Sequence, residues 1–254
     1  CSLRDASSGR AAGEDGRRLR PSSGDDRARL GRVILPCFDP ATWGPSLDAA
    51  VHAVSRGEVI VLPTDTVYGV GVDAFSPEAV GRLLAAKGRD RQMPPPVLIP
   101  GIPTLDALTE EVPPEIRRLV EIFWPGALTV ILPARSSLQW DLGDTGGTVA
   151  LRMPANAYAL ELLAETGPLA VSSANLTGQP AATTAQEAEE MLGESISVYL
   201  DGGMAGADAR GTASTIIDAT PLLTPGGEVR VVREGVIPVS AIMQTLSEIR
   251  AELA

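Results

Sequence analysis

The chain of 254 residues is 44% hydrophobic and 21% charged, a composition typical of a globular protein large enough to bury its own core. Its net charge of −11 and its aromatic content of 4% argue against broad binding to a nucleic-acid backbone, which requires many surface cations. Two cysteines are too few for a disulfide framework, and a single histidine argues against a histidine metal site or a Ser-His-Asp triad. No apolar run approaches the ~20 residues of a membrane span.

The first segment, residues 1–32, holds eight arginines and five acidic residues without apolar periodicity. It lacks the apolar core of a signal peptide, so we predict a disordered tail on a cytoplasmic protein. A lipidated Cys1 is the less favoured alternative to an arbitrary start of the sequence. The remainder, residues 33–254, shows no clear internal linker and is predicted to be a single domain.

Strand-like and helix-like segments alternate from residue 33 onward, which predicts an α/β domain with seven or eight strands. The strand-like segments are residues 32–38, 58–63, 94–100, 127–133, 148–154, 168–173, 197–203, 214–219 and 229–235. The proline run 94–96 favours a strand start or an edge strand.

The helix-like segments are residues 45–57, 76–88, 113–126, 156–167, 183–192 and 240–254. For the first we expect Ser46 as the N-cap and Gly57 as the stop, with His52 off the apolar stripe and without a catalytic role. For the second, Ser76 is a good N-cap and Gly88 a natural terminator.

Polar residues follow several of the predicted strands, where ligands of open α/β sheets bind. These residues are Thr64, Asp65, Thr66, Arg152, Ser172, Ser173, Asn175 and Arg233. Any one of them could be a turn or cap residue, but four such groups together favour a binding site.

Lys87 is the single lysine in a chain with twenty arginines. It continues the inward stripe of Val80, Leu83 and Leu84, so its stem should lie on apolar surface while its ammonium emerges at the helix end. A favourable interaction with the helix dipole is the alternative, although arginine would serve that purpose equally well. The choice of lysine favours a compact charge directed at phosphate or carboxylate. Neither G-x-x-x-x-G-K-[ST] nor G-x-G-x-x-G is present.

The segments "PTDTVYGVGVDA", "AAKGRDRQMP", "FWPGALTVIL", "VALRMP", "PLAVSSANLTGQPAATTAQE", "YLDGG", "GTASTIIDAT" and "VVREG" follow one another in this order. Together they resemble the YrdC/Sua5 family, the threonylcarbamoyl-AMP synthases, over about residues 45–237. The pairing of K-x-R with S-x-N carries the resemblance. It implies the short, single-domain form, with a strongly twisted mixed sheet flanked by helices around a concave, positively charged cavity.

The resemblance also implies a reaction, in which L-threonine, bicarbonate and ATP give L-threonylcarbamoyl-AMP, pyrophosphate and water. Mg²⁺ would accompany ATP, and no metal ligands are expected from the protein. Other enzymes, a tRNA threonylcarbamoyltransferase complex, would receive the product and modify adenosine 37 of tRNA. We expect little or no direct binding of tRNA, and no membrane partner.

The family motifs assign roles to single positions of this sequence. The implied catalytic residues are Lys87, Arg89, Ser173 and Asn175. The implied threonine contacts are Thr66, Arg152 and Ser172. The implied nucleotide contacts are Lys87, Arg89, Thr148, Ser173, Asn175, Ser214, Thr215 and Arg233.

Some positions depart from the family pattern. Met93 and Leu98 stand where some relatives have Asn and His, Ala181 replaces a Ser, and "VREG" replaces "RPG". Arg91 is the candidate to supply the contact of the missing Asn.

Two other functions are compatible with the resemblance. One is a non-catalytic module that binds double-stranded RNA, against which the acidic composition argues. The other is the acyl-transfer part of a carbamoyltransferase, which usually lies in a longer, zinc-containing chain.

Overall fold

The computed structural model describes residues 33–206 and 211–253, so the predicted tail at residues 1–32 lies outside the described residues. Its strands are β1 (Val33–Pro36), β2 (Ile60–Leu62), β3 (Gly69–Asp73), β4 (Val97–Leu98), β5 (Leu128–Pro133), β6 (Thr148–Arg152), β7 (Leu169–Ser173), β8 (Val198–Asp201), β9 (Thr215–Asp218) and β10 (Arg230–Arg233). Its α-helices are α1 (Pro40–Ser55), α2 (Pro77–Lys87), α3 (Ile102–Leu108), α4 (Pro114–Phe123), α5 (Ala157–Thr166), α6 (Ala185–Leu192) and α7 (Val239–Leu253).

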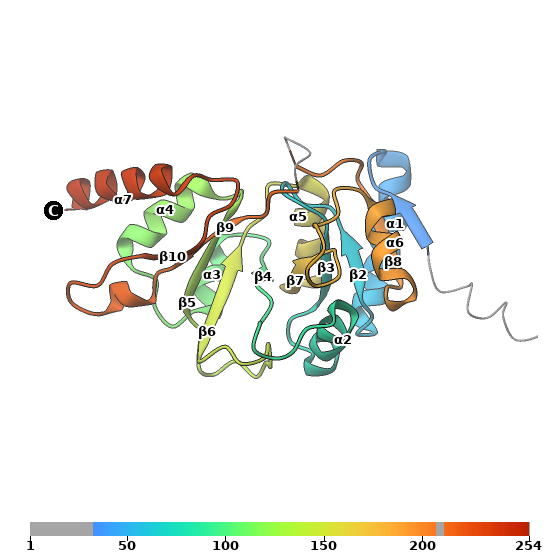
Figure 1. Ribbon diagram of the computed structural model, residues 1–254, viewed down its shortest axis with the longest axis horizontal. Coiled ribbons are helices and arrows are strands. Elements are labelled where there is room, and N and C mark those ends of the chain that lie inside the picture. The colour runs from blue at the N-terminus through green and yellow to red at the C-terminus, as the bar shows by residue number, and fades with distance from the viewer. Residues whose placement is uncertain (1–32, 207–210, 254) are drawn as a thin grey trace, which may run out of the picture. The chain divides into compact units, whose positions relative to one another are not determined.

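All the described strands form one mixed, twisted sheet in the order β1-β8-β2-β3-β7-β4-β6-β5-β9-β10 (Figure 1). The pairs β1/β8, β2/β8, β4/β6 and β5/β9 are parallel, and the other neighbours are antiparallel. The prediction of an α/β sheet flanked by helices is confirmed. The expected number of strands was too low: every predicted strand segment contains a strand, and β3 is added to them.

Helices cover both faces of the sheet because alternate strand residues point to opposite sides. Val61 of β2 joins a large core with residues of α2, α4, α6 and α7, whereas Ile60 and Leu62 join a second core with α1 and α5. Helices α4 and α7 pack together near the β9–β10 end of the sheet (Figure 1).

Helix α1 starts earlier than predicted. Asp39 is the N-cap and accepts a hydrogen bond from the Ala41 amide, while Ser46 lies inside the helix and its hydroxyl donates to the carbonyls of Pro36 and Thr42 at 2.7 and 2.9 Å. Ser46 as the N-cap was therefore wrong, because the helix continues through Pro45 instead of starting after it. His52 is exposed, in agreement with the prediction that it lies off the apolar stripe.

Strand β4 lies inside the sheet, between β7 and β6, so the alternative of an edge strand was wrong. Prolines 94–96 precede it, and the ladder to β6 and β7 begins at Val97, where backbone N–H groups become available again. The alternative of a strand start is confirmed.

Helix α2 has the predicted ends, which fix the residues that follow it. The Ser76 side chain accepts a hydrogen bond from the Ala79 amide, and Gly88 ends the helix in the left-handed conformation, with φ of 61°. The chain therefore leaves the helix after Lys87 in a defined direction, which fixes the position of the Arg89 backbone. Among the described residues, no helix is long and apolar enough to cross a membrane.

Candidate active site

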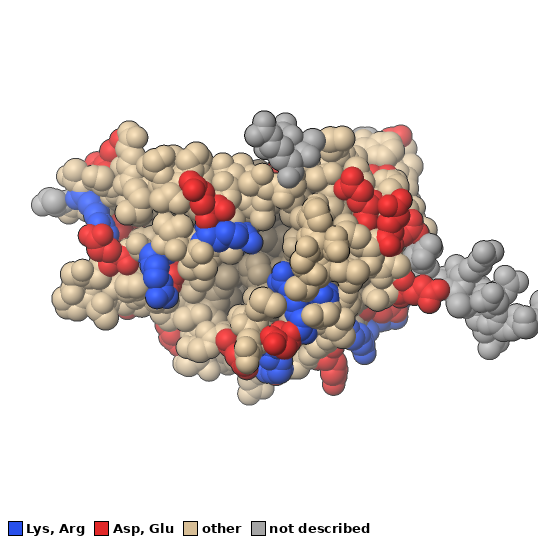
Figure 2. Space-filling view, viewed as in Figure 1, with Lys and Arg blue, Asp and Glu red and all other residues tan. Residues whose placement is uncertain are grey.

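A cleft runs across one face of the sheet, and most of the predicted site residues line it. Its wall includes Thr66, Arg89, Arg152, Ser172, Ser173, Ser214 and Arg233. Residues of five strands also line it: Gly69 of β3, Leu98 of β4, Thr129 of β5, Val171 of β7 and Ile216 of β9. The face in Figure 2 is hollowed near its centre, with basic side chains on either side of the hollow.

This location differs from the predicted one outside the carboxyl ends of parallel strands. Strand β4 is parallel to β6 but antiparallel to β7, so Arg152 and Ser173 stand at the ends of strands that run in opposite directions. Both nevertheless line the same cleft.

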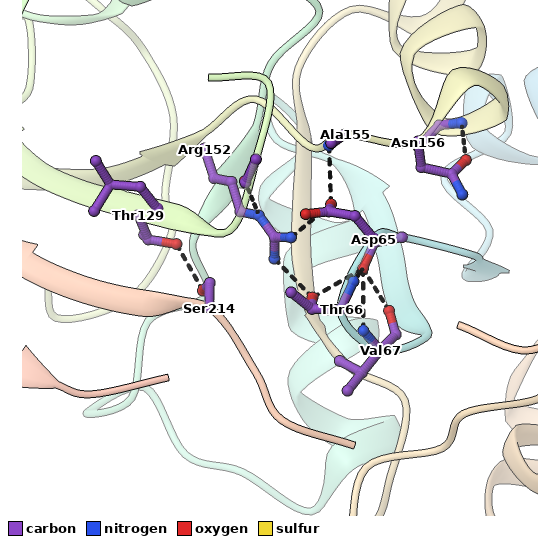
Figure 3. A network of polar contacts seen from close by, with 12 residues as sticks. Asp65, Thr66, Val67, Thr129, Arg152, Ala155, Asn156 and Ser214 are labelled. Carbon is purple, nitrogen blue, oxygen red and sulfur yellow. Dashed lines mark hydrogen bonds and ion pairs between the residues drawn. The ribbon is translucent and has the colours of Figure 1, made fainter. Parts of the chain in front are cut away.

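Arg152 is held in place from three sides (Figure 3). Its Nε donates to the Gly126 carbonyl at 2.9 Å, Nη1 to Thr66 Oγ1 at 3.0 Å and Nη2 to Asp65 Oδ1 at 2.7 Å. The Ala155 amide also donates to Asp65 Oδ1, at 2.9 Å. Since a guanidinium has five N–H groups, Arg152 keeps donors for a ligand after these three bonds. Burial lowers the pKa of Arg152, so a ligand carboxylate would meet a poorly solvated cation.

Lys87 is buried, with none of its surface exposed, and this corrects the prediction for its ammonium group. The stem follows the apolar stripe as expected, but Nζ turns inward and donates to the carbonyls of Ser173 and Asn175 and, at 2.9 Å, to Asn175 Oδ1. An ammonium has three donors, so all of them are used within the protein. Lys87 does not line the cleft; it lies behind the turn that carries Ser173 and Asn175.

The same turn is fixed by further bonds. The Ser173 hydroxyl donates to Asn175 Oδ1 at 2.6 Å, and the Asn175 amide donates to the carbonyls of Leu176 and Gln179. The Thr177 hydroxyl donates to the Lys87 carbonyl at 2.8 Å. Lys87 thus orients Ser173, which faces the cleft, through Asn175, which does not line it.

Burial lowers the pKa of Lys87 to about 7, with a smaller contribution from the charge of Arg89. In the unfolded chain the group stays protonated to about pH 10.4. Between about pH 7 and 10 the unfolded state therefore binds more protons, so this group should make the free energy of unfolding rise with pH. Urea unfolding across this pH range should show that the free energy of unfolding rises with pH in the unmodified protein and rises less in Lys87→Met. Equal slopes of this free energy against pH in the two proteins would contradict the lowered pKa of Lys87.

Arg89 is the cation with the most unused hydrogen-bonding capacity in the cleft. Its Nη1 donates to Ser172 Oγ at 3.1 Å, and its Nε is buried without a partner in the described part of the chain. Arg233 donates from Nε and Nη2 to the Ser214 carbonyl, and burial together with the charge of Arg89 lowers its pKa. Two cations near each other in one cleft favour an anionic ligand.

Besides Lys87 and Asn175, two further predicted nucleotide contacts are not in this cleft. Thr215 is fully buried; its hydroxyl donates to the Ile237 carbonyl and accepts from the Gly235 amide. Thr148 lines an adjoining apolar pocket, and its hydroxyl donates to the Thr145 carbonyl at 2.8 Å. The two cavities share Pro94, Pro96 and Ile216, so a ligand larger than one cavity could extend from the cleft toward Thr148.

The departures from the family pattern have different locations. Leu98 lines the cleft, whereas Met93 is exposed and neither it nor Ala181 lines the cleft. Arg91 does not line the cleft, and its Nη2 donates to Asp141 Oδ1 at 2.5 Å; that it replaces the missing Asn contact stays a prediction.

Sequence reasoning missed Thr129 and assigned no role to Asp65. Thr129 is buried in β5, where its hydroxyl lies 2.8 Å from that of Ser214. A lone polar residue within the apolar run "LTVIL" was the available signal. For Asp65 the signal was its place in the "TDT" turn, but its partner Arg152 is far away in the sequence.

Comparisons with known proteins agree with this fold. The family model Sua5/YciO/YrdC, described as "Telomere recombination", matches residues 52–235. The chain is 46% identical over 220 residues to a Mycobacterium leprae protein with the provisional name threonylcarbamoyl-AMP synthase, covering 87% of this chain and 96% of the relative. It is 38% identical over 200 residues to the threonylcarbamoyl-AMP synthase of Bacillus subtilis, covering 78% of this chain and 58% of the relative.

Among solved structures, Sua5 of P. abyssi complexed with L-threonine matches with a TM-score of 0.76 and 32% identity, covering 85% of this chain and 61% of that chain. The chain belongs to the Sua5/YciO/YrdC family.

Proposed function

We propose that the protein is an L-threonylcarbamoyladenylate synthase, a nucleotidyltransferase that acts on L-threonine, bicarbonate and ATP. The observation that carries the proposal is the pair of cationic regions in one cleft: Arg152 with Thr66 in one, Arg89 with Arg233 in the other. An amino acid and a nucleotide phosphate need two such regions close together. The names of the relatives support this assignment.

In the proposed reaction, the threonine amine first adds to bicarbonate-derived carbon dioxide and forms a carbamate. A carbamate oxygen then attacks the α-phosphorus of ATP, and the bond between that phosphorus and the bridging oxygen of pyrophosphate breaks. Negative charge accumulates on the phosphoryl oxygens and on the leaving group. Catalysis therefore requires positioned cations and hydrogen-bond donors rather than a histidine base.

The residues divide this task by location. Arg152 can hold the threonine carboxylate with the N–H groups that its protein partners leave free. Arg89 and Arg233 can bind phosphate, and the hydroxyls of Ser172 and Ser214 can donate to phosphate or carbamate oxygens. The Ser173 hydroxyl, which donates to Asn175 Oδ1, can do so only after rotating away from that partner. Lys87 does not contact the substrate; it is a positioning residue that holds the turn of Ser173 and Asn175.

Magnesium enters this scheme as part of the MgATP substrate. The residues that line the cleft include no carboxylate, and no cluster of three or more His, Cys, Asp or Glu suited to a metal ion occurs among the described residues. Mg²⁺ bound mainly through phosphates and water fits such a site.

The product is a reactive mixed anhydride, so a separate transferase should receive it and carry out the modification of tRNA. The acidic composition supports this division, because it disfavours strong binding of tRNA by the synthase itself. We also place the reaction in the cytoplasm.

Release of pyrophosphate tests the reaction class. It should require threonine and bicarbonate together, because the attacking group is their carbamate. Omission of either should reduce the rate to the background measured without enzyme. Equal release with ATP alone would refute the proposal and identify an ATP pyrophosphohydrolase instead.

A further inference from the structure

The connection between β5 and β6 is unusually long for a hairpin. The two strands pair antiparallel up to Pro133 and Thr148, and residues 134–147 join them. Hairpin loops usually have about 2–5 residues, and connections beyond ~12 without secondary structure are mostly functional. Residues 134–147 do not line the main cleft, although Leu142 and Thr145 line the adjoining apolar pocket, so they can act on the cleft through a neighbouring segment.

That neighbour is the segment of residues 88–96, which leads from α2 to β4 and carries Arg89. The Asp144 amide donates to the Arg91 carbonyl at 2.8 Å, and Arg91 Nη2 donates to Asp141 Oδ1 at 2.5 Å. Because both side chains of this ion pair are substantially exposed, the pair itself should contribute little. The backbone contact is the stronger constraint.

Gly143 makes the contact possible. Its φ is +103°, and a Cβ atom built on it would lie 2.7 Å from the Arg91 carbonyl oxygen. Any larger residue at this position must therefore displace the backbone of residue 91 or of the loop itself. The close approach holds the two segments at a fixed separation.

Further contacts join the same two regions. The ring of Trp140 stacks on Phe75, just before α2, with centroids 5.5 Å apart and an angle of 21° between the planes. Leu142 lines the adjoining apolar pocket together with prolines 94–96. Residues 134–147 thus contact the chain on both sides of α2, the helix that ends at Lys87.

Arg89 needs such support, because its own side chain is weakly held. Its Nη1 donates to the Ser172 hydroxyl, whereas its Nε is buried without a partner among the described residues. The position of its guanidinium thus depends on the backbone of residues 88–96. We propose that residues 134–147 are a tether loop that positions Arg89 for the nucleotide phosphates; this rests on the function proposed above.

Gly143→Ala tests the tether, and Gly146→Ala is its matched control. Both glycines lie in the tether loop at positive φ, but a Cβ on Gly146 would meet nothing within 4 Å. Both variants therefore carry backbone strain, and Gly143→Ala alone pushes on Arg91. We expect Gly143→Ala to weaken binding of MgATP at least about tenfold, without a change in threonine affinity, and to speed amide exchange in residues 88–93.

The two measurements, calorimetric titration with MgATP and hydrogen exchange, separate this proposal from the proposed function. If the unmodified protein does not bind MgATP, the proposed function fails, while exchange in residues 88–93 still tests the tether. Equal effects of the two variants, or no effect of Gly143→Ala on exchange, would overturn the tether. If Gly143→Ala does not fold, Asp141→Ala loosens the same backbone contact, because the Asp141 carboxylate also accepts a hydrogen bond from the Gly143 amide at 3.1 Å. Unchanged exchange in residues 88–93 of that variant would also overturn the tether.

Discussion

Replacing Lys87 by methionine should lower turnover about a hundredfold, even though Lys87 touches no substrate in the proposed scheme. Methionine fills the apolar channel of the stem but donates no hydrogen bond to Ser173 or Asn175. The turn should then shift, and displacement of a catalytic group by about 1 Å typically costs that factor. Steady-state pyrophosphate release measures the loss.

The same variant should also be less stable, by about 1–3 kcal/mol, because acceptors that Lys87 satisfies remain buried. A solvent-facing ammonium, as expected from the sequence, would have predicted almost no change in stability. Lys87→Arg should not restore activity, since a planar guanidinium cannot direct its donors at the three acceptors of an ammonium site. Full activity of Lys87→Arg would contradict the positioning role.

Replacing Arg152 by methionine should raise the KM for threonine at least about a hundredfold, because a buried charged partner of a carboxylate is worth ~2–5 kcal/mol. It should also destabilise the fold by about 3 kcal/mol, since Asp65 would lose its ionic partner in a largely buried position. Kinetics with varied threonine and urea unfolding measure the two effects separately.

The double variant Arg152→Met with Asp65→Asn separates binding from folding. It removes both charges, so stability should return largely toward that of the unmodified protein, while the KM for threonine stays high. Recovery of threonine affinity in the double variant would show that Arg152 acts on the fold and not on the substrate.

Local signals in the sequence predicted much of the fold. Ser76 and Gly88 define the ends of α2 as expected, because caps are determined by neighbouring residues. The start of α1 was misplaced because Gly44 and Pro45 resemble a helix boundary, yet the helix begins at Pro40, after the Asp39 N-cap, and runs through them. Strand β3, rich in glycine, gives a weak strand signal and is formed by its pairing with β2 and β7.

The site was less predictable than the fold, because its geometry depends on contacts distant in sequence. The family motifs named Lys87, but whether its ammonium faces solvent or the turn of Ser173 depends on a strand 86 residues away. Likewise, nothing near Asp65 indicates that Arg152 is its partner. Sequence patterns thus identified the residue types, and the mixed sheet determined which of them meet.

The most direct measurement of the proposed function is detection of the product itself. The protein should be incubated with MgATP, L-threonine and isotope-labelled bicarbonate, and the nucleotides analysed by mass spectrometry. We predict an adenylate that contains both threonine and the labelled carbon, formed in amounts equal to the pyrophosphate released. AMP or ADP without such an adduct, at any concentration of threonine and bicarbonate, would contradict the proposal.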